Sequence, residues 1–336
     1  MARANAAYYA EKDPFKDFTT APEITQVFGE LLGAWSAVVW ETLGRPNPVL
    51  LVECGPGRGT LMQDALRTIA RVAPAFHAAL HLHIVETSPR LRAEQASRLP
   101  AATWHDTIEH LPQAPFILLA NEFLDALPIR QFVRRDGAWL ERYIQAGTFT
   151  EAPLPPSLSG RDWEWVTQAG ARVTQQLFEP PAIPEIIEHC QPALEFTTHL
   201  AHRLKKTRGA ALILDYGYAH PPNRPTLQAI RDGHPADPLA HPGTADLTAH
   251  VDFGTLAHEA RAQGIAVHGP IQQGPFLARL GLFQRTGILA RTQPFTRAAA
   301  LIDAAQRLAE PDRMGGLFKA LCLCQPELPV PPGFEP

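Results

Sequence analysis

The clearest chemical signal in the sequence is a glycine-rich loop within residues 49–61, VLLVECGPGRGTL. An apolar run typical of a buried parallel strand precedes Gly55, Gly57 and Gly59, and a predicted helix follows them. Glycines let the backbone turn tightly and approach a ligand closely, and the start of the helix presents free amide groups to it. Because the spacing is GxGxG and not the GxGxxG of a dinucleotide fingerprint, the loop alone predicts a nucleotide-type site without identifying the ligand.

Two acids beside this loop narrow the choice of ligand. Glu53 ends the strand directly before the glycines, where it would repel a pyrophosphate but attract a cation. S-adenosyl-L-methionine has no phosphate and carries a sulfonium and an ammonium group, so Glu53 favours it over NAD. Glu86 closes the next predicted strand, where its carboxylate can accept hydrogen bonds from both ribose hydroxyls. Taken singly, either acid is also compatible with a solvated strand end.

Further acids follow the next two predicted strands. Asp106 ends the short segment TWHD, Glu122 lies at the end of the strand predicted over 116–123, and Asp125 follows it. In open α/β sheets the carboxyl ends of adjacent strands face the crevice that binds ligands. We therefore expect these acids to border the same site, with Asp106 as a further cofactor-binding candidate.

The elements that must position these residues alternate between strand and helix along the chain. This order predicts a doubly wound, mostly parallel, seven-stranded sheet of the Rossmann-like type. The predicted strands are 49–54, 80–86, 103–106, 116–123 and 210–216, and the predicted helices are 19–43, 60–73, 90–99 and 184–206. Residues 253–271 read as a helix followed by a strand.

The remaining segments predict additions to this core. Residues 128–145 read as a hairpin that turns at Asp136 and Gly137, and a proline-rich stretch follows over 151–160. Residues 276–324 read as helical, before a proline-rich tail. The expected division is a helical lid (1–45), a first core part (46–135), an insertion with a connecting helix (136–204), a second core part (205–275) and a helical extension with the tail (276–336).

Composition excludes several classes of protein. The chain has 336 residues, of which 45% are hydrophobic and 19% charged, as expected of a folded enzyme. A net charge of −4 provides no basic field for nucleic acid. No apolar run approaches the ~18 residues of a membrane span, the first residues lack signal-peptide character, and four scattered cysteines predict reduced thiols and no metal site. We therefore expect a soluble protein of the bacterial cytoplasm, or of the mitochondrial matrix if the source is eukaryotic.

Seven stretches in chain order resemble the MidA-like S-adenosylmethionine-dependent methyltransferases, whose mitochondrial members are complex I assembly factors that methylate an arginine. The stretches are DFTTAPEITQVFGELLG (17–33), VECGPGRGTL (52–61), NEFLDALPIRQF (121–132), LILDYGY (212–218), GTADLTAHVDFGTL (243–256), GPIQQGPFLARLG (269–281) and RMGGLFKAL (313–321). The chain differs from the family in a shorter segment before DFTT and in a poor match over 146–185. The resemblance implies symmetric dimethylation of a protein arginine, with an NADH dehydrogenase subunit as the partner.

The implied chemistry assigns roles to the acids after the fourth strand. Carboxylates can fork onto a guanidinium group and fix one nitrogen toward the methyl group, and Glu122 and Asp125 are the candidates. If a helical turn follows the strand, their spacing places both on one side; the alternative is that they are charges of a helix N-terminus. Asn121 either holds a substrate amino group or caps that helix.

For two other polar residues the sequence leaves two interpretations open, and for several more it assigns no definite role. Glu23, after Pro22, is either a helix N-terminal charge or a cofactor contact, and Arg58 pairs with either the cofactor carboxylate or Glu53. Asp215 and Tyr216 end the fifth strand at a crevice wall, and Asp246, His250 and Asp252 form a polar cluster without an assigned role. His81 and His83 share a strand face, but no other ligand set has metal-site spacing.

Three other functions compete with arginine methylation. One is a methyltransferase for another nucleophile or a small molecule, and one is an assembly or binding protein that retains the cofactor pocket with little catalysis. A nicotinamide dehydrogenase follows from the loop geometry only, and Glu53 disfavours it.

Overall fold

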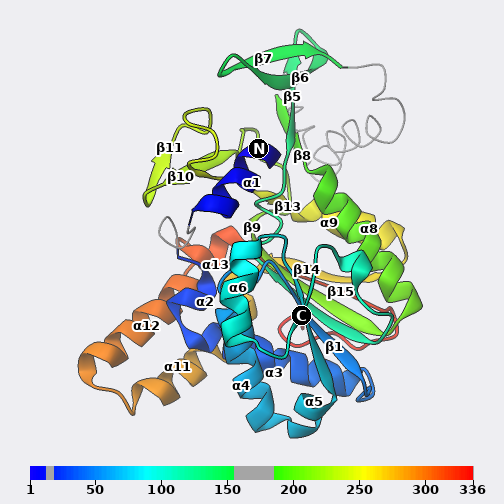
Figure 1. Ribbon diagram of the computed structural model, residues 1–336, viewed down its shortest axis with the longest axis vertical. Helices are drawn as coiled ribbons and strands as arrows, with labels where there is room; N and C mark the ends of the chain where they lie inside the picture. Colours follow the sequence, from blue (N-terminus) through cyan, green and yellow to red (C-terminus); the bar gives the residue numbers. More distant parts are fainter. Residues whose placement is uncertain (13–18, 155–184, 336) are drawn as a thin grey trace, which may run out of the picture. The chain divides into compact units, whose positions relative to one another are not determined.

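The computed structural model describes residues 1–12, 19–154 and 185–335 (Figure 1). Contacts within the chain divide it into two compact units. Unit 1 comprises Met1–Phe18, Asp125–Glu195 and Tyr218–Leu256, and unit 2 comprises Thr19–Leu124, Phe196–Gly217 and Ala257–Pro336. The first segment of the division expected from the sequence, 1–45, is thus shared between the units, and that division as a whole stays a prediction.

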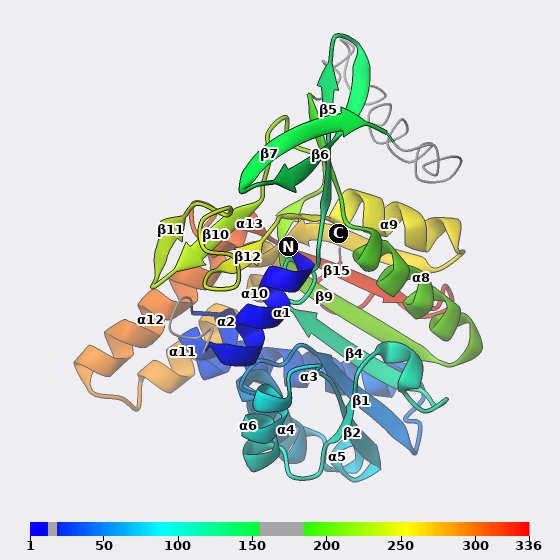
Figure 2. The same cartoon turned by 45° about the horizontal axis from the view of Figure 1, so that its top comes forward.

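Unit 2 is built on the main sheet, whose strand order is β14-β15-β9-β4-β1-β2-β3. Figure 2 labels β15, β9, β4, β1 and β2 of this sheet. Neighbours from β3 through β2, β1 and β4 to β9 are parallel, whereas β15 is antiparallel to both β9 and β14. This arrangement confirms the predicted doubly wound α/β class. The strands are β1 (Val49–Cys54), β2 (Leu80–Val85), β3 (Thr103–His105), β4 (Phe116–Asn121), β9 (Gly209–Tyr218), β14 (Ala266–Gln272) and β15 (Phe318–Cys324).

Strand β4 is buried along its whole length because helices cover both of its faces. Ile117 and Leu119 join the core beneath helix α3 (Gln26–Thr42), while the ring of Phe116 contacts Arg203 of helix α8 (Gln191–Lys206). A strand covered on both sides has no polar face, which is why its sequence, FILLAN, reads as a continuous apolar run.

The helix predicted over 19–43 is interrupted at Thr25. Its backbone is extended there, at φ −157°, and its hydroxyl accepts a hydrogen bond from the Val27 amide as the N-cap of α3. The apolar periodicity did not reveal this break, because Ala21 and Ile24 of α2 pack in the same core cluster as the apolar residues of α3. The other helices of unit 2 are α2 (Ala21–Ile24), α4 (Thr60–Val72), α5 (Pro74–Ala79), α6 (Pro89–Arg98), η2 (Ile108–His110), α10 (Gln273–Arg279), α11 (Leu282–Ala290), α12 (Phe295–Ala309) and α13 (Met314–Leu317).

The prediction that 276–324 is helical throughout is wrong at its end. Phe318–Cys324 forms β15, which lies between β9 and β14 and pairs Leu321 with Ile213. The segment is buried apart from the half-buried Lys319, and an apolar run buried on both sides carries no period that separates a strand from a helix. The last core strand therefore comes from the segment expected to be an extension.

Unit 1 contains two antiparallel sheets and α1 (Ala2–Glu11). The hairpin predicted over 128–145 is confirmed, with Asp136 and Gly137 at φ +50° and +82° in its turn. The helix predicted over 184–206 begins only at Gln191, because Ile186–His189 pairs with β5 as β8. The sheet orders are β7-β6-β5-β8 and β11-β10-β12, formed by β5 (Arg130–Arg135), β6 (Ala138–Gln145), β7 (Thr148–Pro153), β8, β10 (Gln228–Arg231), β11 (His234–Ala236) and β12 (Asp246–Thr248).

Three further observations complete the fold. Of the proline-rich stretch predicted over 151–160, residues 155–160 lie outside the described residues. The helix-then-strand prediction for 253–271 is confirmed by α9 (Phe253–Ala262) and β14, and Val251–Asp252 forms the short β13. Among the described helices, none has the length and apolar character that a membrane crossing requires.

Candidate functional site

The glycine loop leaves the carboxyl end of β1 in a conformation that favours glycine. Gly55, Gly57 and Gly59 have φ values of +61°, +55° and +81°, and Gly59 is the N-cap of α4. A Cβ atom on Gly55 would lie 2.8 Å from the Phe123 ring, so the loop after β4 packs directly against it. The Gly55 amide donates to the Val85 carbonyl at 2.9 Å, which ties the loop to the end of β2.

Glu53 is the most unusual group of this loop. Its side chain is 2% exposed, and burial raises the pKa of its carboxyl to about 8. Within the described residues, its Oε2 atom is buried and has no hydrogen-bond partner. A buried carboxyl with an unused acceptor is costly unless a ligand completes its environment. Glu53 therefore fits a cationic group such as the ammonium or sulfonium of S-adenosyl-L-methionine.

Glu86 follows β2 and is held in place by its surroundings. Its Oε1 accepts from the Ser88 amide at 2.8 Å and its Oε2 from Gln95 Nε2 at 3.3 Å. Burial raises the pKa of Glu86, against the opposing effect of these hydrogen bonds. A fixed carboxylate at the end of the second strand suits the paired hydroxyls of a ribose, as the sequence predicts.

Gln95 of α6 is a site residue that the sequence analysis missed. It is fully buried, its amide nitrogen donates to the Gly57 carbonyl at 2.8 Å, and its Oε1 accepts from Trp104 Nε1 at 2.9 Å. It thus links the glycine loop to Glu86. Nothing local in the sequence distinguishes it, because its role depends on a helix packing beside a loop 38 residues earlier.

Asp106 and Arg58 lie at the edge of this arrangement. The Asp106 side chain is 65% exposed and pairs with Arg92 at 2.6 Å, while Arg92 also donates to the Glu86 carbonyl at 2.7 Å. Arg92 thus links Asp106 to the backbone of Glu86, and the predicted cofactor contact of Asp106 stays a prediction. Arg58 lies 3.4 Å from Glu94, an ion pair that differs from both partners considered in the sequence analysis.

Glu23 connects the segment before α3 to the start of α4. Its Oε1 accepts from the hydroxyl of Thr60 at 2.5 Å, and Arg98 donates to the same hydroxyl at 2.8 Å. Because Thr60 directly follows Gly59, Glu23 supports the glycine loop from the side of α2. This contact adds to its place in the first turn of α2.

The loop after β4 adopts a strained turn. Glu122 has φ +51°, its amide donates to the Leu214 carbonyl, and its Oε1 accepts from the Ala21 amide at 3.2 Å and from Asn121 at 3.1 Å. Non-glycine residues rarely adopt this conformation, which is concentrated at functional sites. Asn121 is 7% exposed, and its Oδ1 is buried without a partner in the described part of the chain.

Asp215 fixes this turn from the neighbouring strand β9. It is fully buried, and its Oδ2 accepts from the amides of Phe123 and Leu124 at 3.1 and 2.9 Å. A carboxylate that accepts two backbone amides gives strong, charge-assisted hydrogen bonds. From the sequence, Asp215 was expected at a crevice wall; in the structure it holds the turn that contains Glu122.

The prediction of a helical turn after β4 is wrong. Residues 122–129 form bends and turns, because the positive φ of Glu122 redirects the chain, so Glu122 and Asp125 share no helix face and neither is a helix N-terminal charge. Asp125 belongs to unit 1, where its carbonyl accepts from the Ala249 amide at 3.0 Å.

The polar cluster of Asp246, His250 and Asp252 makes hydrogen bonds within unit 1. Tyr9 donates to Asp246 at 2.7 Å, and burial, together with the charges of Asp246 and Asp125, raises the pKa of Tyr9. Asp252 accepts from the amide and the hydroxyl of Thr255 at 3.0 and 2.8 Å, so it caps α9. The amide of His250 donates to the Thr226 hydroxyl.

His83 of β2 contacts His105 of the neighbouring strand β3. His83 Nδ1 lies 2.8 Å from His105 Nε2, and burial followed by the charges of His105 and His81 lowers the pKa of His83 to about 4. Over residues 1–12, 19–154 and 185–335, no group of three or more His, Cys, Asp or Glu side chains has the geometry of a metal site.

The geometry predicts that Glu86→Ala weakens binding of S-adenosylhomocysteine by about tenfold or more, because two charge-assisted hydrogen bonds to the ribose are lost. Calorimetric titration measures this change. Glu41→Gln is the control, since Glu41 lies on α3 in an exposed ion pair with Arg45 and is not among the predicted site residues. An unchanged affinity in Glu86→Ala would remove Glu86 from the ribose site.

The sequence matches a known family model and is similar to several named proteins. A family model described as "Putative S-adenosyl-L-methionine-dependent methyltransferase" matches residues 31–271. The protein arginine methyltransferase NDUFAF7 homolog of Drosophila melanogaster, a mitochondrial protein, is 34% identical over 96% of this chain and 79% of its own length. The mitochondrial protein arginine methyltransferase NDUFAF7 of Homo sapiens is 30% identical over 94% of this chain and 76% of its own length.

Two solved structures from Burkholderia thailandensis share the fold. One, a COG1565 superfamily member crystallised with S-adenosyl-homocysteine, has a TM-score of 0.72 and 24% identity and covers 95% of this chain and 80% of its own. The other, an uncharacterized COG1565 superfamily protein, has a TM-score of 0.75 and 24% identity over 100% of this chain and 87% of its own.

Proposed function

Since the chain belongs to this family of S-adenosyl-L-methionine-dependent methyltransferases, we propose that it transfers the methyl group to a guanidinium nitrogen of a protein arginine. The observation that carries the proposal is the turn after β4, in which Phe123 packs against the glycine loop and the preceding Asn121 and Glu122 supply an amide and a carboxylate. The names of relatives at 30% identity and above, protein arginine methyltransferases, support the same target.

The cofactor fits the groups around the glycine loop. Glu53 would hold a cationic part of S-adenosyl-L-methionine, and the loop itself would approach it closely. Glu86, braced by Gln95, would receive the ribose hydroxyls. When bound, the cofactor supplies an activated methyl group on a sulfonium, which is a good leaving group. The contribution that remains for the protein is alignment, which in model systems is worth effective molarities of ~10⁵ to 10⁸ M.

The substrate nitrogen needs a partner that fixes it and neutralises its charge. A guanidinium group has a pKa above ~12 and delocalises its lone pair, so its nitrogens are weak nucleophiles. The Glu122 carboxylate would accept hydrogen bonds from the guanidinium, hold one nitrogen in line for transfer and stabilise the charge that develops. The buried Oδ1 of Asn121 offers a second acceptor. A substrate contact by Asp125 stays the prediction that the sequence gives.

The partner inferred from the family resemblance is a subunit of respiratory NADH dehydrogenase, with symmetric dimethylation that supports assembly of the complex. We also propose that the protein acts in a bacterial cytoplasm, as predicted from the sequence. The relatives named above are mitochondrial proteins.

We expect one arginine of an NADH dehydrogenase subunit to be symmetrically dimethylated in the source cells and unmodified when the gene is deleted. Mass spectrometry of the purified complex from both strains measures this difference. Complementation with the native gene restores the modification and serves as the control. An identical methylation state of every subunit in both strains would contradict this choice of partner, while leaving other protein arginines open.

A further inference from the structure

A row of basic side chains on α8 borders a cavity of unit 2 that methyl transfer does not use. His199, His202, Arg203 and Lys206 occur at spacings of three, four and seven residues, which place them on one side of the helix. The cavity has a volume of about 170 Å³ and is also lined by Ile108, Glu109 and Gln113. This is more than ten times the ~15 Å³ that one water molecule requires.

Arg203 is a buried cation without a carboxylate partner in the described part of the chain. It is 6% exposed, and burial alone lowers its pKa. Its guanidinium donates to the carbonyls of Leu111, at 3.2 Å, and Pro112, and lies 5.0 Å from the centre of the Phe116 ring. Its Nε is buried and has no hydrogen-bond partner among the described residues. Leaving such a charge unpaired costs free energy that an anion would recover.

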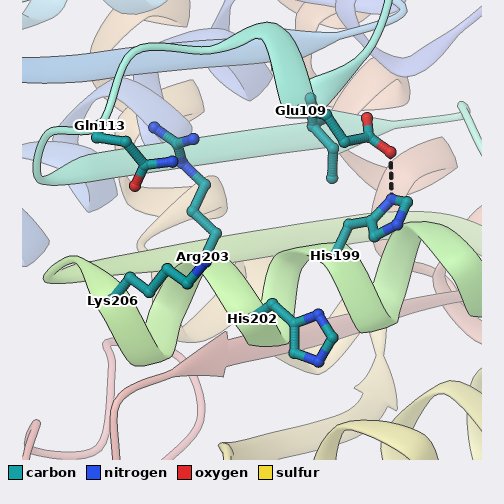
Figure 3. Close-up of a pocket in the computed structure, with 7 residues that line it drawn as sticks. Glu109, Gln113, His199, His202, Arg203 and Lys206 are labelled. Carbon is teal, nitrogen blue, oxygen red and sulfur yellow. Dashed lines mark ion pairs between the residues drawn. The ribbon is translucent and has the colours of Figure 1, made fainter.

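The surroundings of Arg203 are arranged for an anion at one end of the cavity. In Figure 3 the side chains of Gln113, Arg203 and Lys206 gather at the same end, whereas His202 points away from them. The one acid of the lining, Glu109, lies at the other end and forms an ion pair with His199. Glu109 is therefore separated from the end of the cavity where Arg203, Lys206 and Gln113 gather.

The cavity lies near the amino ends of the parallel strands, whereas the glycine loop lies at their carboxyl ends. Gln113 precedes Phe116, the first residue of β4, and Lys206 precedes Gly209, the first residue of β9. The glycine loop follows the last residue of β1, which runs parallel to β4. A ligand in the cavity would thus be separate from the cofactor.

We propose that this cavity binds a small oxyanion of the phosphate type, with Arg203, Lys206 and Gln113 as its hydrogen-bond donors. Phosphate presents oxygens in several directions, which matches donors from a helix and from the connection before β4. A purely structural role would instead use the basic residues of the last turn of α8 to favour the helix dipole, with no ligand involved.

Thermal unfolding of the full chain in sodium phosphate and in sodium chloride of equal ionic strength tests the proposal. We expect millimolar phosphate to raise the melting temperature, because a ligand that binds only the folded state stabilises it. Acetate at the same concentration separates phosphate from carboxylate recognition, and we expect it to give a smaller shift. Lys206→Gln should weaken phosphate binding by about tenfold, whereas Lys205→Gln, one position along the helix and outside the lining, should not.

Three results would overturn the proposal: no phosphate-specific shift in the native protein, a shift that survives in Lys206→Gln, or an equal loss in Lys205→Gln. The last result would show only a general effect of positive charge. Gln113→Leu removes a donor without changing charge, and a retained shift in that variant would exclude Gln113 alone from the donor set. Affinity for S-adenosylhomocysteine, measured in the same variants, should stay at the native value and shows that each has folded.

Discussion

Replacing Glu53 with Gln is expected to stabilise the protein at alkaline pH and to weaken cofactor binding at the same time. The carboxyl of Glu53 has a pKa of about 8 in the folded protein, raised by burial from an ordinary value of 4.5. Between these two values the folded state binds more protons than the unfolded state. The free energy of unfolding therefore falls as the pH rises from about 4.5 to 8, and the stability that the protonated acid preserved is lost above that range.

Gln does not titrate, so the variant should lose this pH dependence. By linkage, the gain relative to the native protein at pH 9 is at most about 5 kcal/mol, and it vanishes near pH 4. Urea unfolding at both pH values measures it. Glu41→Gln is the control, since Glu41 lies on the exposed side of α3 in an ion pair with Arg45 and should give the same small change at both pH values. A native protein as stable at pH 9 as Glu53→Gln would contradict the buried, partnerless state of this acid.

The second half of the Glu53 prediction concerns the ligand. A cation beside Glu53 favours the ionised carboxylate, and Gln cannot supply that charge. We expect the affinity for S-adenosylhomocysteine, whose ammonium group is cationic, to fall by about tenfold or more. Greater stability with lower affinity in one variant is the expected sign of a residue kept for function and not for the fold.

Replacing Glu122 with Gln is expected to lower the rate of methyl transfer by about a hundredfold while cofactor binding is retained. Gln keeps an oxygen that can accept from the Ala21 amide and so preserves the turn, but it loses the charge that would hold a guanidinium. Removal of one group that stabilises a developing charge typically costs 10² to 10³ in rate. Steady-state kinetics with labelled cofactor, together with calorimetric binding of S-adenosylhomocysteine, separates the two effects.

Asp215→Asn provides the structural comparison for this prediction. Asp215 holds the Phe123 and Leu124 amides from beneath the turn and does not belong to the proposed substrate contacts. Its loss should lower stability and activity together, whereas Glu122→Gln should lower activity alone. Full activity in Glu122→Gln would show that its carboxylate only anchors the segment before α2.

Local sequence patterns correctly predicted those strands and turns whose residues have a strong preference for that structure. The apolar runs of β1 and β4, the glycines before α4 and the Asp136–Gly137 turn each have a residue signature, and each lies where it was expected. Glu53 and Glu86 could be predicted as candidate site residues because they lie at the ends of recognisable strands.

Pairing between distant segments determined the rest. Phe318–Cys324 is a strand only because β9 and β14 flank it, and Ile186–His189 only because β5 does. Gln95 and Asp215 have their roles because they reach backbone groups far away in the chain, which no local motif encodes. The expected helical face of Glu122 and Asp125 failed for a related reason: Asp215 holds the turn in a conformation that the sequence spacing does not reveal.

The most direct test of the account is the identity of the methylated residue. The purified chain is incubated with S-adenosyl-L-methionine labelled in its methyl group and with extract from cells that lack the gene. The labelled protein is then hydrolysed to amino acids. We expect label in methylated arginine, and much less with Glu122→Gln. Label confined to another amino acid or to a small molecule, or equal labelling with Glu122→Gln, would contradict it.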